Sequence, residues 1–441
     1  MGLAGGGRGH TEVSRESSAA RAFLPGVLIT TDVYPPLCGG SGWSAHALAL
    51  TLRDHGHRVR VLELDAGASG HDHRLYEGVS IDRLGIRRQR RSPLRRLGGH
   101  DYAFRAVRDR VGQMLRQEPE LRIVHGQHLH SGPGAIAAAL ANGRAAVLTL
   151  RDYWPVCLHG TTWWGGGKCA GCTRVNLSGC MQEVFGLPAA AAHALRPWAR
   201  RRLATRAGDV SRAHRVLAVS ETLRERLRAG GLTVPIDVVP NIIDPERSAN
   251  AAAAAIDAAP GLPRPFLLAA GKLGAAKGFD ALLEELAAVK QALPLVVAGA
   301  GPAKRRLEEQ ARELGLETRF VGWIDGGAVL RLMRDAEAVI LPSLWEEPLA
   351  RVLLEAMSVG TPVISWPVGS SREVIDDGVN GWIVSAAGDL GRVLSELRAA
   401  GTRSRVAAAS AATVRRRFAP AAVYPQLMAV YEAAMRDAGD V

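Results

Sequence analysis

Short apolar runs alternate with amphipathic helical stretches along almost the whole chain, and the alternation comes in two sets. The runs of the first set, between residues 24 and 240, are GVLITT, RVRVLEL, RIVHGQ, AAVLTL, HRVLAVS and IDVVP. Those of the second set, between 265 and 366, are FLLAAG, LPLVVAGAG, TRFVGW, AVILPS and TPVISW. Buried strands that alternate with helices predict a mainly parallel sheet with helices on both faces. We therefore expect an α/β chain of two doubly wound domains, with ligands bound in the cleft between them at the carboxyl ends of the strands.

Changes in composition set the limits of these domains. Residues 1–23 are small and polar and predict a disordered leader. The first domain spans 24–240, an Ala- and Pro-rich linker spans 241–264, and the second domain spans 265–400. Helices are expected in 401–441, and the apolar spacing from Val423 to Tyr431 predicts a last helix that packs back toward the first domain.

Composition also excludes several classes of protein. The leader lacks the apolar core of a signal peptide, and no apolar run is long enough to span a membrane. Five cysteines in 441 residues are too few for the disulfide framework of a secreted scaffold. These observations predict a cytoplasmic protein.

The excess of positive over negative charge lies entirely in the first half of the chain. Residues 1–240 hold 33 Lys and Arg against 19 Asp and Glu, with dense runs at 83–96 and 196–228, whereas 241–441 hold 22 against 24. Such patches are typical of binding to polyanions, although a solvated arginine-rich surface explains them equally well. No nucleic-acid recognition motif accompanies them, so we expect no nucleic-acid partner. Docking on an anionic membrane surface fits the same charge if the acceptor is linked to a lipid.

Two glutamates flank a predicted helix start within residues 342–384. Glu347 precedes Pro348, a residue favoured at the first helical position, and the stretch to Met357 has a helical apolar face. A diphosphate would fit against the free backbone N–H groups at Leu349, Ala350 and Arg351. Glu355 follows about 12 Å further along the helix. The two carboxylates would therefore accept hydrogen bonds from hydroxyl groups on either side of the diphosphate, Glu347 from a sugar and Glu355 from a ribose. Alternatively, the acids are ordinary helix residues exposed to solvent.

Two lysines lie in one loop between a strand and a helix, in the sequence AAGKLGAAKGF. The chain has 50 Arg but only 5 Lys, so the occurrence of both Lys272 and Lys277 here is notable. Fixed cations at such a turn would stabilise the charge that develops on a diphosphate leaving group. The alternative is that both lysines are simply solvated.

Four cysteines lie in a Gly-rich insertion, residues 157–180. They are Cys157, Cys169, Cys172 and Cys180, with C-x2-C spacing in the middle pair. Four thiolates satisfy the tetrahedral shell of zinc, so this is a candidate structural zinc site, and free thiols or a disulfide are the alternatives.

The order of these motifs resembles the retaining, GT-B type nucleotide-sugar glycosyltransferases of family 4. The resemblance rests on E-x7-E from Glu347 to Glu355 and on the segments YPPLCGG, VVPNIID, GKLGAAKG, VAGAGP and VGWID, which cover almost the whole chain after residue 24. It implies two Rossmann-like domains facing across a cleft. It also implies transfer of a sugar from a nucleoside diphosphate to an acceptor hydroxyl on a glycan or lipid-linked molecule, in cell-surface glycan or polysaccharide biosynthesis. No obligatory catalytic metal is expected.

The resemblance assigns roles to several residues on the donor side. Lys277 would contact the donor diphosphate, together with Lys272 at a position more often held by Arg. Glu347 would hold hydroxyls of the transferred sugar, and Glu355 those of the ribose. The backbone at Gly39 and Gly40 would approach the diphosphate from the first domain, with no side chain in the way.

The acceptor side departs from the family pattern. In RIVHGQHLHSG, Gln127 replaces the second His of a common His-x-His, and we expect His128 in the acceptor pocket. Three histidines within six residues suggest a polar wall. Arg151 stands where His is common, which suggests an anionic acceptor. A non-catalytic nucleotide-sugar-binding protein of the same fold is the alternative function.

Overall fold

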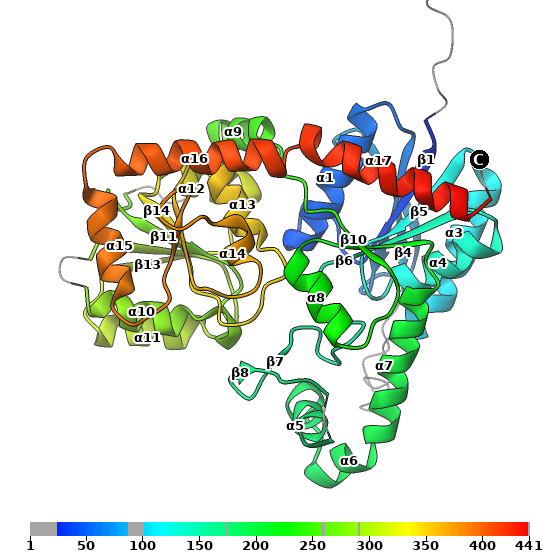
Figure 1. Cartoon of the computed structure of the whole chain (residues 1–441), viewed down its shortest axis with the longest axis horizontal. Coiled ribbons are helices and arrows are strands. Elements are labelled where there is room, and N and C mark those ends of the chain that lie inside the picture. Colours follow the sequence, from blue (N-terminus) through cyan, green and yellow to red (C-terminus); the bar gives the residue numbers. More distant parts are fainter. Residues whose placement is uncertain (1–23, 87–100, 173, 257–260, 290–291, 440–441) are drawn as a thin grey trace, which may run out of the picture.

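The computed structural model describes residues 24–86, 101–172, 174–256, 261–289 and 292–439, so the leader and most of the basic run at 83–96 lie outside the described residues. Two separate sheets form the cores of two domains that stand side by side (Figure 1). A smaller part, containing α5 and α6, projects below the first domain (Figure 1).

The first domain contains an eight-stranded sheet in the order β10-β9-β6-β5-β1-β2-β4-β3. All its pairings are parallel except that of β3 with β4. Its strands are β1 (Gly26–Thr31), β2 (Val59–Asp65), β3 (Gly70–Tyr76), β4 (Val79–Gly85), β5 (Leu121–Gly126), β6 (Ala145–Leu150), β9 (Arg215–Ala218) and β10 (Ile236–Val238). Its helices are α1 (Gly40–Asp54), α3 (Asp101–Gln117), α4 (Gly132–Ala141), α7 (Arg196–Ser211) and α8 (Glu221–Ala229). The insertion adds β7 (Trp163–Trp164), β8 (Gly167–Lys168), α5 (Arg174–Phe185) and α6 (Ala189–Ala194).

The second domain contains a six-stranded, fully parallel sheet in the order β13-β12-β11-β14-β15-β16. Its strands are β11 (Leu267–Ala270), β12 (Leu295–Ala298), β13 (Thr318–Gly322), β14 (Ala338–Leu341), β15 (Val363–Ser365) and β16 (Trp382–Ile383). The 3-10 turn η1 (Ala275–Lys277) precedes its helices α10 (Phe279–Ala287), α11 (Lys304–Glu313), α12 (Gly326–Asp335), α13 (Arg351–Ser358), α14 (Ser371–Val374), α15 (Asp389–Arg398) and α16 (Thr402–Arg417). The predicted fold class, two doubly wound α/β domains, is confirmed.

Two elements of the fold differ clearly from the prediction, the segment after the first domain and a hairpin at the edge of the first sheet. The segment 241–264, interpreted as a linker, contains helix α9 (Pro245–Ala254), which packs against α12 as part of the second domain. Asp244 caps this helix by accepting the Arg247 N–H at 3.0 Å, and Pro245 follows at the first helical position. The hairpin of β3 and β4 was not predicted.

The chain crosses between the domains twice. It passes from β10 into α9 at 241–244 and from α16 into α17 (Pro420–Asp437) at 418–420. The two crossings are joined by a backbone hydrogen bond from Ile243 N to Phe418 O of 2.9 Å. Helix α17 lies on the first sheet (Figure 1), where Val423, Leu427 and Tyr431 are buried.

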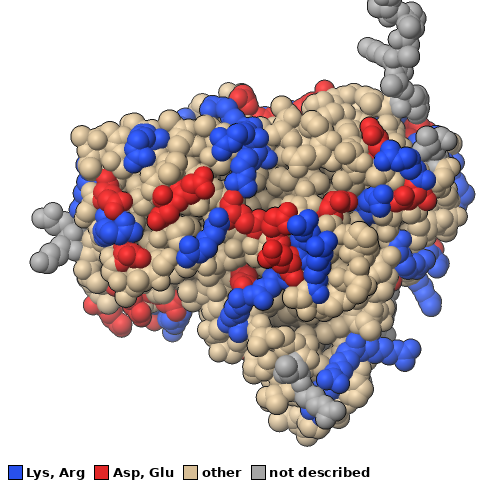
Figure 2. All heavy atoms as spheres, viewed as in Figure 1, with Lys and Arg blue, Asp and Glu red and all other residues tan. Residues whose placement is uncertain are grey.

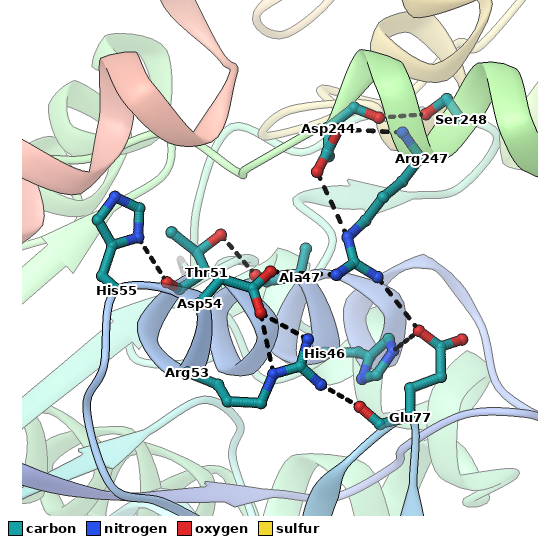
Figure 3. A network of polar contacts seen from close by, with 10 residues as sticks. All are labelled: His46, Ala47, Thr51, Arg53, Asp54, His55, Glu77, Asp244, Arg247 and Ser248. Carbon is teal, nitrogen blue, oxygen red and sulfur yellow. Dashed lines mark hydrogen bonds and ion pairs between the residues drawn. The ribbon is translucent and has the colours of Figure 1, made fainter.

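A polar network fixes the first crossing against the first domain (Figure 3). The Arg247 guanidinium contacts Asp54 at 3.0 Å, Asp244 at 3.4 Å and Glu77 at 3.5 Å. Glu77 also lies 3.3 Å from His46 Nε2 on α1. Three carboxylates therefore surround the first arginine after the crossing.

Among the described residues, no helix combines the length and the apolarity that crossing a bilayer requires.

Candidate active site at the junction of the two domains

The lysine loop and the Glu347 loop meet at the carboxyl end of the second sheet. Strands β11 and β14 are neighbours in that sheet, so the loops that follow them lie side by side. Gly278, with φ +66°, makes this contact possible, because a Cβ there would lie 2.0 Å from the Pro342 carbonyl oxygen. Both loops carry candidate residues in the sequence, and the order of strands in the sheet brings them together.

Lys277 and Glu347 form an ion pair at this contact. Lys277 Nζ lies 2.6 Å from Glu347 Oε1, and the Ser343 hydroxyl donates to the same oxygen. The Lys277 ammonium also lies 5.6 Å from the centre of the Trp345 ring. Lys272, in contrast, is exposed and makes no ion pair with a described residue.

Helix α13 begins at Arg351, three residues later than the sequence predicted. Leu349 and Ala350 therefore precede the first turn, and Pro348 is not its first residue. Ala350 is the N-cap and has no side chain to accept a hydrogen bond, so the first N–H groups of the helix lack a side-chain cap. The predicted spacing of about 12 Å between the two glutamates assumed a continuous helix, and it no longer applies.

Glu355 is paired with an arginine of its own helix. Arg351 Nε donates to Glu355 Oε1 at 2.7 Å, and Arg351 Nη1 lies 3.5 Å from the Ser44 hydroxyl on α1 of the first domain. A Cβ on Gly40 would lie 3.4 Å from Arg351 Cβ, which shows how closely the starts of α1 and α13 approach. A Cβ on Gly39 would meet nothing within 4 Å, so the fold gives no steric reason for glycine there.

His128 lies at the carboxyl end of the first sheet, after β5. The Asp32 amide donates to His128 Nδ1 at 3.3 Å, which places the proton of a neutral imidazole on Nε2. Burial lowers the pKa of His128 to about 4, so the ring is neutral at pH 7. Its Nε2 is buried and has no hydrogen-bond partner in the described protein, so it remains available as a donor to a ligand.

The predicted polar wall of three histidines is wrong for His125. Its Nδ1 lies 2.7 Å from the Tyr431 hydroxyl on α17 and its Nε2 lies 2.7 Å from Thr149 Oγ1, so both ring nitrogens are used inside the core. Burial lowers the pKa of His125 to about 3. This histidine holds the terminal helix against the sheet and cannot face a substrate.

Arg151 is a recessed cation with neutral partners. Its Nε donates to Asn241 Oδ1 at 3.0 Å and its Nη1 to Gln127 Oε1. Among the described residues, no carboxylate forms an ion pair with it. Burial and the charge of Arg351 lower the pKa of Arg151 to about 9, which still leaves it protonated at pH 7. A charge held this way favours an anionic ligand.

Two carboxylates that follow strands of the first sheet were not predicted. Asp32 follows β1 and accepts the His130 and Ser131 N–H groups at 3.0 and 2.8 Å, at the start of α4. Asp152 follows β6, and burial raises its pKa to about 6. The signal available in the sequence was their position directly after a buried strand.

The two domains touch beside Glu347, through the preceding residue. Glu346 Oε1 accepts from Arg226 of α8 and from Lys168 of β8, each at 2.6 Å. Burial opposes ionisation, but these two hydrogen bonds hold the pKa of Glu346 below its ordinary value. The Tyr153 hydroxyl donates to the Glu346 carbonyl at 2.9 Å. Three groups of the first domain therefore fix the loop that carries Glu347.

The four cysteines of the insertion lie away from this junction. All four thiols are free and line one small cavity between β7, β8 and α5. Cys38 lies apart from them, with its sulfur against Gly42 of α1.

Two protein-family profiles match the chain, one over each of its two domains. The profile of Glycosyltransferase Family 4 matches residues 38–247, and that of Glycosyl transferases group 1 matches residues 253–396. The phosphatidyl-myo-inositol mannosyltransferase of Mycobacterium tuberculosis is 31% identical over 226 residues, which are 49% of this chain and 58% of the relative. The 2-deoxystreptamine glucosyltransferase of Streptomyces kanamyceticus is 30% identical over 215 residues, which are 46% of this chain and 53% of the relative.

Among solved structures, Anabaena HepE in complex with UDP-glucose superposes with a TM-score of 0.65 at 17% identity, over 93% of this chain and all of HepE. At that identity the likeness defines the fold, which is GT-B, with two Rossmann-like domains face to face. Because the two profiles match the two domains in turn, the chain belongs to the group 1 glycosyltransferases. Its matches span between 36% and 58% of the length of the curated relatives.

Proposed function

We propose that the chain is a retaining glycosyltransferase that moves a sugar from a nucleoside diphosphate to an acceptor hydroxyl. The observation that carries this proposal is the ion pair of Lys277 with Glu347, four residues before the uncapped start of α13 at Arg351. Cations and free backbone N–H groups bind a diphosphate, and the carboxylates accept sugar hydroxyls. The names of the relatives support a hexosyl donor, since one is a mannosyltransferase and another a glucosyltransferase.

In this proposal the ion pairs of the ligand-free site are exchanged for contacts with the donor. Lys277 turns from Glu347 to the diphosphate, and Lys272 is a second cation there. Glu347 then accepts hydrogen bonds from hydroxyls of the transferred sugar. Arg351 and Glu355 separate in the same way, and Glu355 accepts the ribose hydroxyls. As the bond to the sugar breaks, the diphosphate gains negative charge, and these fixed cations stabilise it. His128 is neutral and has a free Nε2–H. It donates a hydrogen bond from this group to the acceptor or to the transferred sugar, and so orients it.

Calorimetric titration with UDP, GDP and ADP and with their sugar conjugates tests the donor site. We expect one nucleotide to bind, and the corresponding sugar conjugate to be consumed when acceptors are supplied. Nuclear magnetic resonance of the product should show the anomeric configuration of the donor, and an inverted product would contradict the retaining assignment. Binding without hydrolysis of the donor or transfer to any acceptor would favour a non-catalytic nucleotide-sugar-binding protein.

An anionic acceptor is the finer part of the proposal. Arg151 supports it, because its charge is recessed at the junction and is neutralised by no described carboxylate. The test measures KM for a neutral acceptor and for its phosphorylated or carboxylated counterpart, in wild type and in Arg151→Gln. We expect the charged acceptor to have the lower KM in wild type only, and equal KM values in wild type would contradict the idea.

We further propose that the chain works at an anionic membrane surface, in the assembly of a cell-surface glycan or polysaccharide. Arg200 and Arg201 of α7 are exposed and form no ion pair with a described residue, and they lie near the projecting part. On the face shown in Figure 2, acidic and basic groups alternate over the two domains, whereas basic groups predominate on the projection. Flotation with liposomes tests this, with and without anionic lipid. We expect binding to the anionic liposomes that is lost at high salt, and no binding at low salt would contradict it.

A further inference from the structure

The insertion after β6 has too small a core to hold its shape by apolar packing alone. Its fully buried apolar side chains form a small separate cluster, namely Leu158, Leu177, Met181, Ala192 and Ala199, and the side chains that complete it are only partly buried, namely Cys172, Phe185, Leu187, Leu195, Trp198 and Leu203. Segments of this size usually need a disulfide or a metal ion to fold stably. All cysteines of the chain are free, so no disulfide is present.

The cysteines come from three different parts of this small unit. Cys169 and Cys172 follow the hairpin of β7 and β8, Cys180 lies within α5, and Cys157 lies in the loop after β6. Gly171, with φ +115°, makes the tight turn between the two cysteines of the C-x2-C pair. A hairpin, a C-x2-C turn and a helix with a further cysteine are thus folded around one point.

The hairpin and α5 are in direct contact at the cysteines. A Cβ on Gly179 would lie 2.1 Å from the Trp164 ring, so β7 packs on the helix immediately beside Cys180. All four sulfur-bearing residues line one cavity of about 10 Å³, which is room for a single water-sized sphere. In the described part of the chain, no three His, Cys, Asp or Glu side chains already stand as a ligand set, so the thiols would have to turn inward to bind an ion.

Cys157 differs from the other three because it belongs to the body of the first domain. The buried guanidinium of Arg206 on α7 donates to the carbonyl oxygens of Trp154, Cys157 and Leu158, each at 3.3 Å. An ion held by all four thiols would therefore join the hairpin and α5 to the first domain. It would also fix Lys168, which directly precedes Cys169 and pairs with Glu346 of the second domain at 2.6 Å.

We propose that Cys157, Cys169, Cys172 and Cys180 bind one structural zinc ion, which holds the hairpin so that Lys168 contacts Glu346 beside the donor site. Zinc takes four thiolates in tetrahedral geometry at about 2.3 Å, and a closed site of this kind is structural, with no position for a substrate. The thiols give up their protons on binding, so loading releases protons. Zinc here takes no part in glycosyl transfer.

Metal analysis of the full-length protein, purified without chelator, tests the site. We expect about one zinc ion per chain in wild type and in the matched control Cys38→Ser, and loss of zinc in Cys172→Ser and Cys180→Ser. A further variant, Lys168→Ala, should keep its zinc, because that side chain is no ligand. Wild-type protein without zinc that also fails to take it up would overturn the proposal, as would a disulfide found among the four cysteines by mass spectrometry.

A spectrum keeps the proposal testable if the cysteine variants fail to fold. Cobalt exchanged into wild-type protein should give the intense thiolate-to-metal absorption and visible bands of a tetrahedral thiolate site. Weak bands typical of oxygen ligands would contradict the four-thiolate assignment. Neither readout requires transferase activity, so failure here is distinct from failure of the proposed function.

Discussion

The substitution Lys277→Ala removes one of the two lysines of the proposed donor site. Lys277 Nζ lies 2.6 Å from Glu347 Oε1, and its side chain is 30% exposed. A partly exposed ion pair contributes at most about 1 kcal/mol to folding, so the variant should unfold close to the wild-type temperature. In the proposed reaction, the same ammonium placed 4 Å from a phosphoryl oxygen would contribute on the order of 4 kcal/mol at an effective dielectric constant near 20.

We therefore expect transfer by Lys277→Ala to fall about 10²- to 10³-fold, the usual cost of one lost transition-state donor. The assay is kcat/KM for release of the nucleoside diphosphate, with thermal unfolding measured on the same samples. Lys304→Ala is the matched control, because Lys304 lies on α11 and its one ion pair with a described residue is with Glu308 of its own helix. Lys277→Arg keeps the charge and should recover part of the activity. Turnover by Lys277→Ala within about threefold of the Lys304→Ala value would refute the role of this lysine.

Three further changes act on the fold. Arg206→Met removes the donor of three buried carbonyl groups and should lower the free energy of unfolding by about 2–4 kcal/mol in urea titrations; a loss below about 0.5 kcal/mol would contradict this. Leu427→Ala opens a cavity under α17 and should cost about 2–4 kcal/mol by the same measurement, whereas the same change at exposed Leu75 should cost little. His125 has a folded pKa of about 3, below its unfolded value of about 6.5, so the unfolded state binds the proton first and stability is lost as the pH falls below about 6.5. Between pH 7.5 and 5.5 the protonation of this residue should lower the free energy of unfolding by about 1.4 kcal/mol. A His125→Gln variant whose free energy of unfolding depends on pH as in wild type would contradict the assignment.

Short apolar runs in the sequence were enough to predict the central strands of both sheets, because these strands are buried on both faces. Strand β3 was missed because its residues, GHDHRLY, are exposed and polar and give no periodic signal. Helix α9 was missed because its alanines read as a linker, although α12 covers one side of it.

The sequence singled out several residues of the candidate site, but not Asp32 or Asp152, and it did not give the arrangement of the site. The ion pair of Lys277 with Glu347 depends on β11 and β14 being neighbours, which the order of strands in the sequence does not reveal. The start of α13 was misplaced because contacts with the first domain override the local preference of Pro348, whose carbonyl oxygen accepts from the Ser220 hydroxyl. His125 looked like a site residue because its partner Tyr431 is more than 300 positions away.

The double crossing of the chain has a consequence for any attempt to divide the protein. Residues 24–244 alone would leave the apolar surface for Val423, Leu427 and Tyr431 open to water, so a first half expressed by itself should aggregate. Supplying 420–439 as a separate peptide, or fusing it after a flexible spacer, should restore solubility. The smallest autonomous first domain is thus made of two separate stretches of sequence. The second domain is the continuous stretch that lies between them.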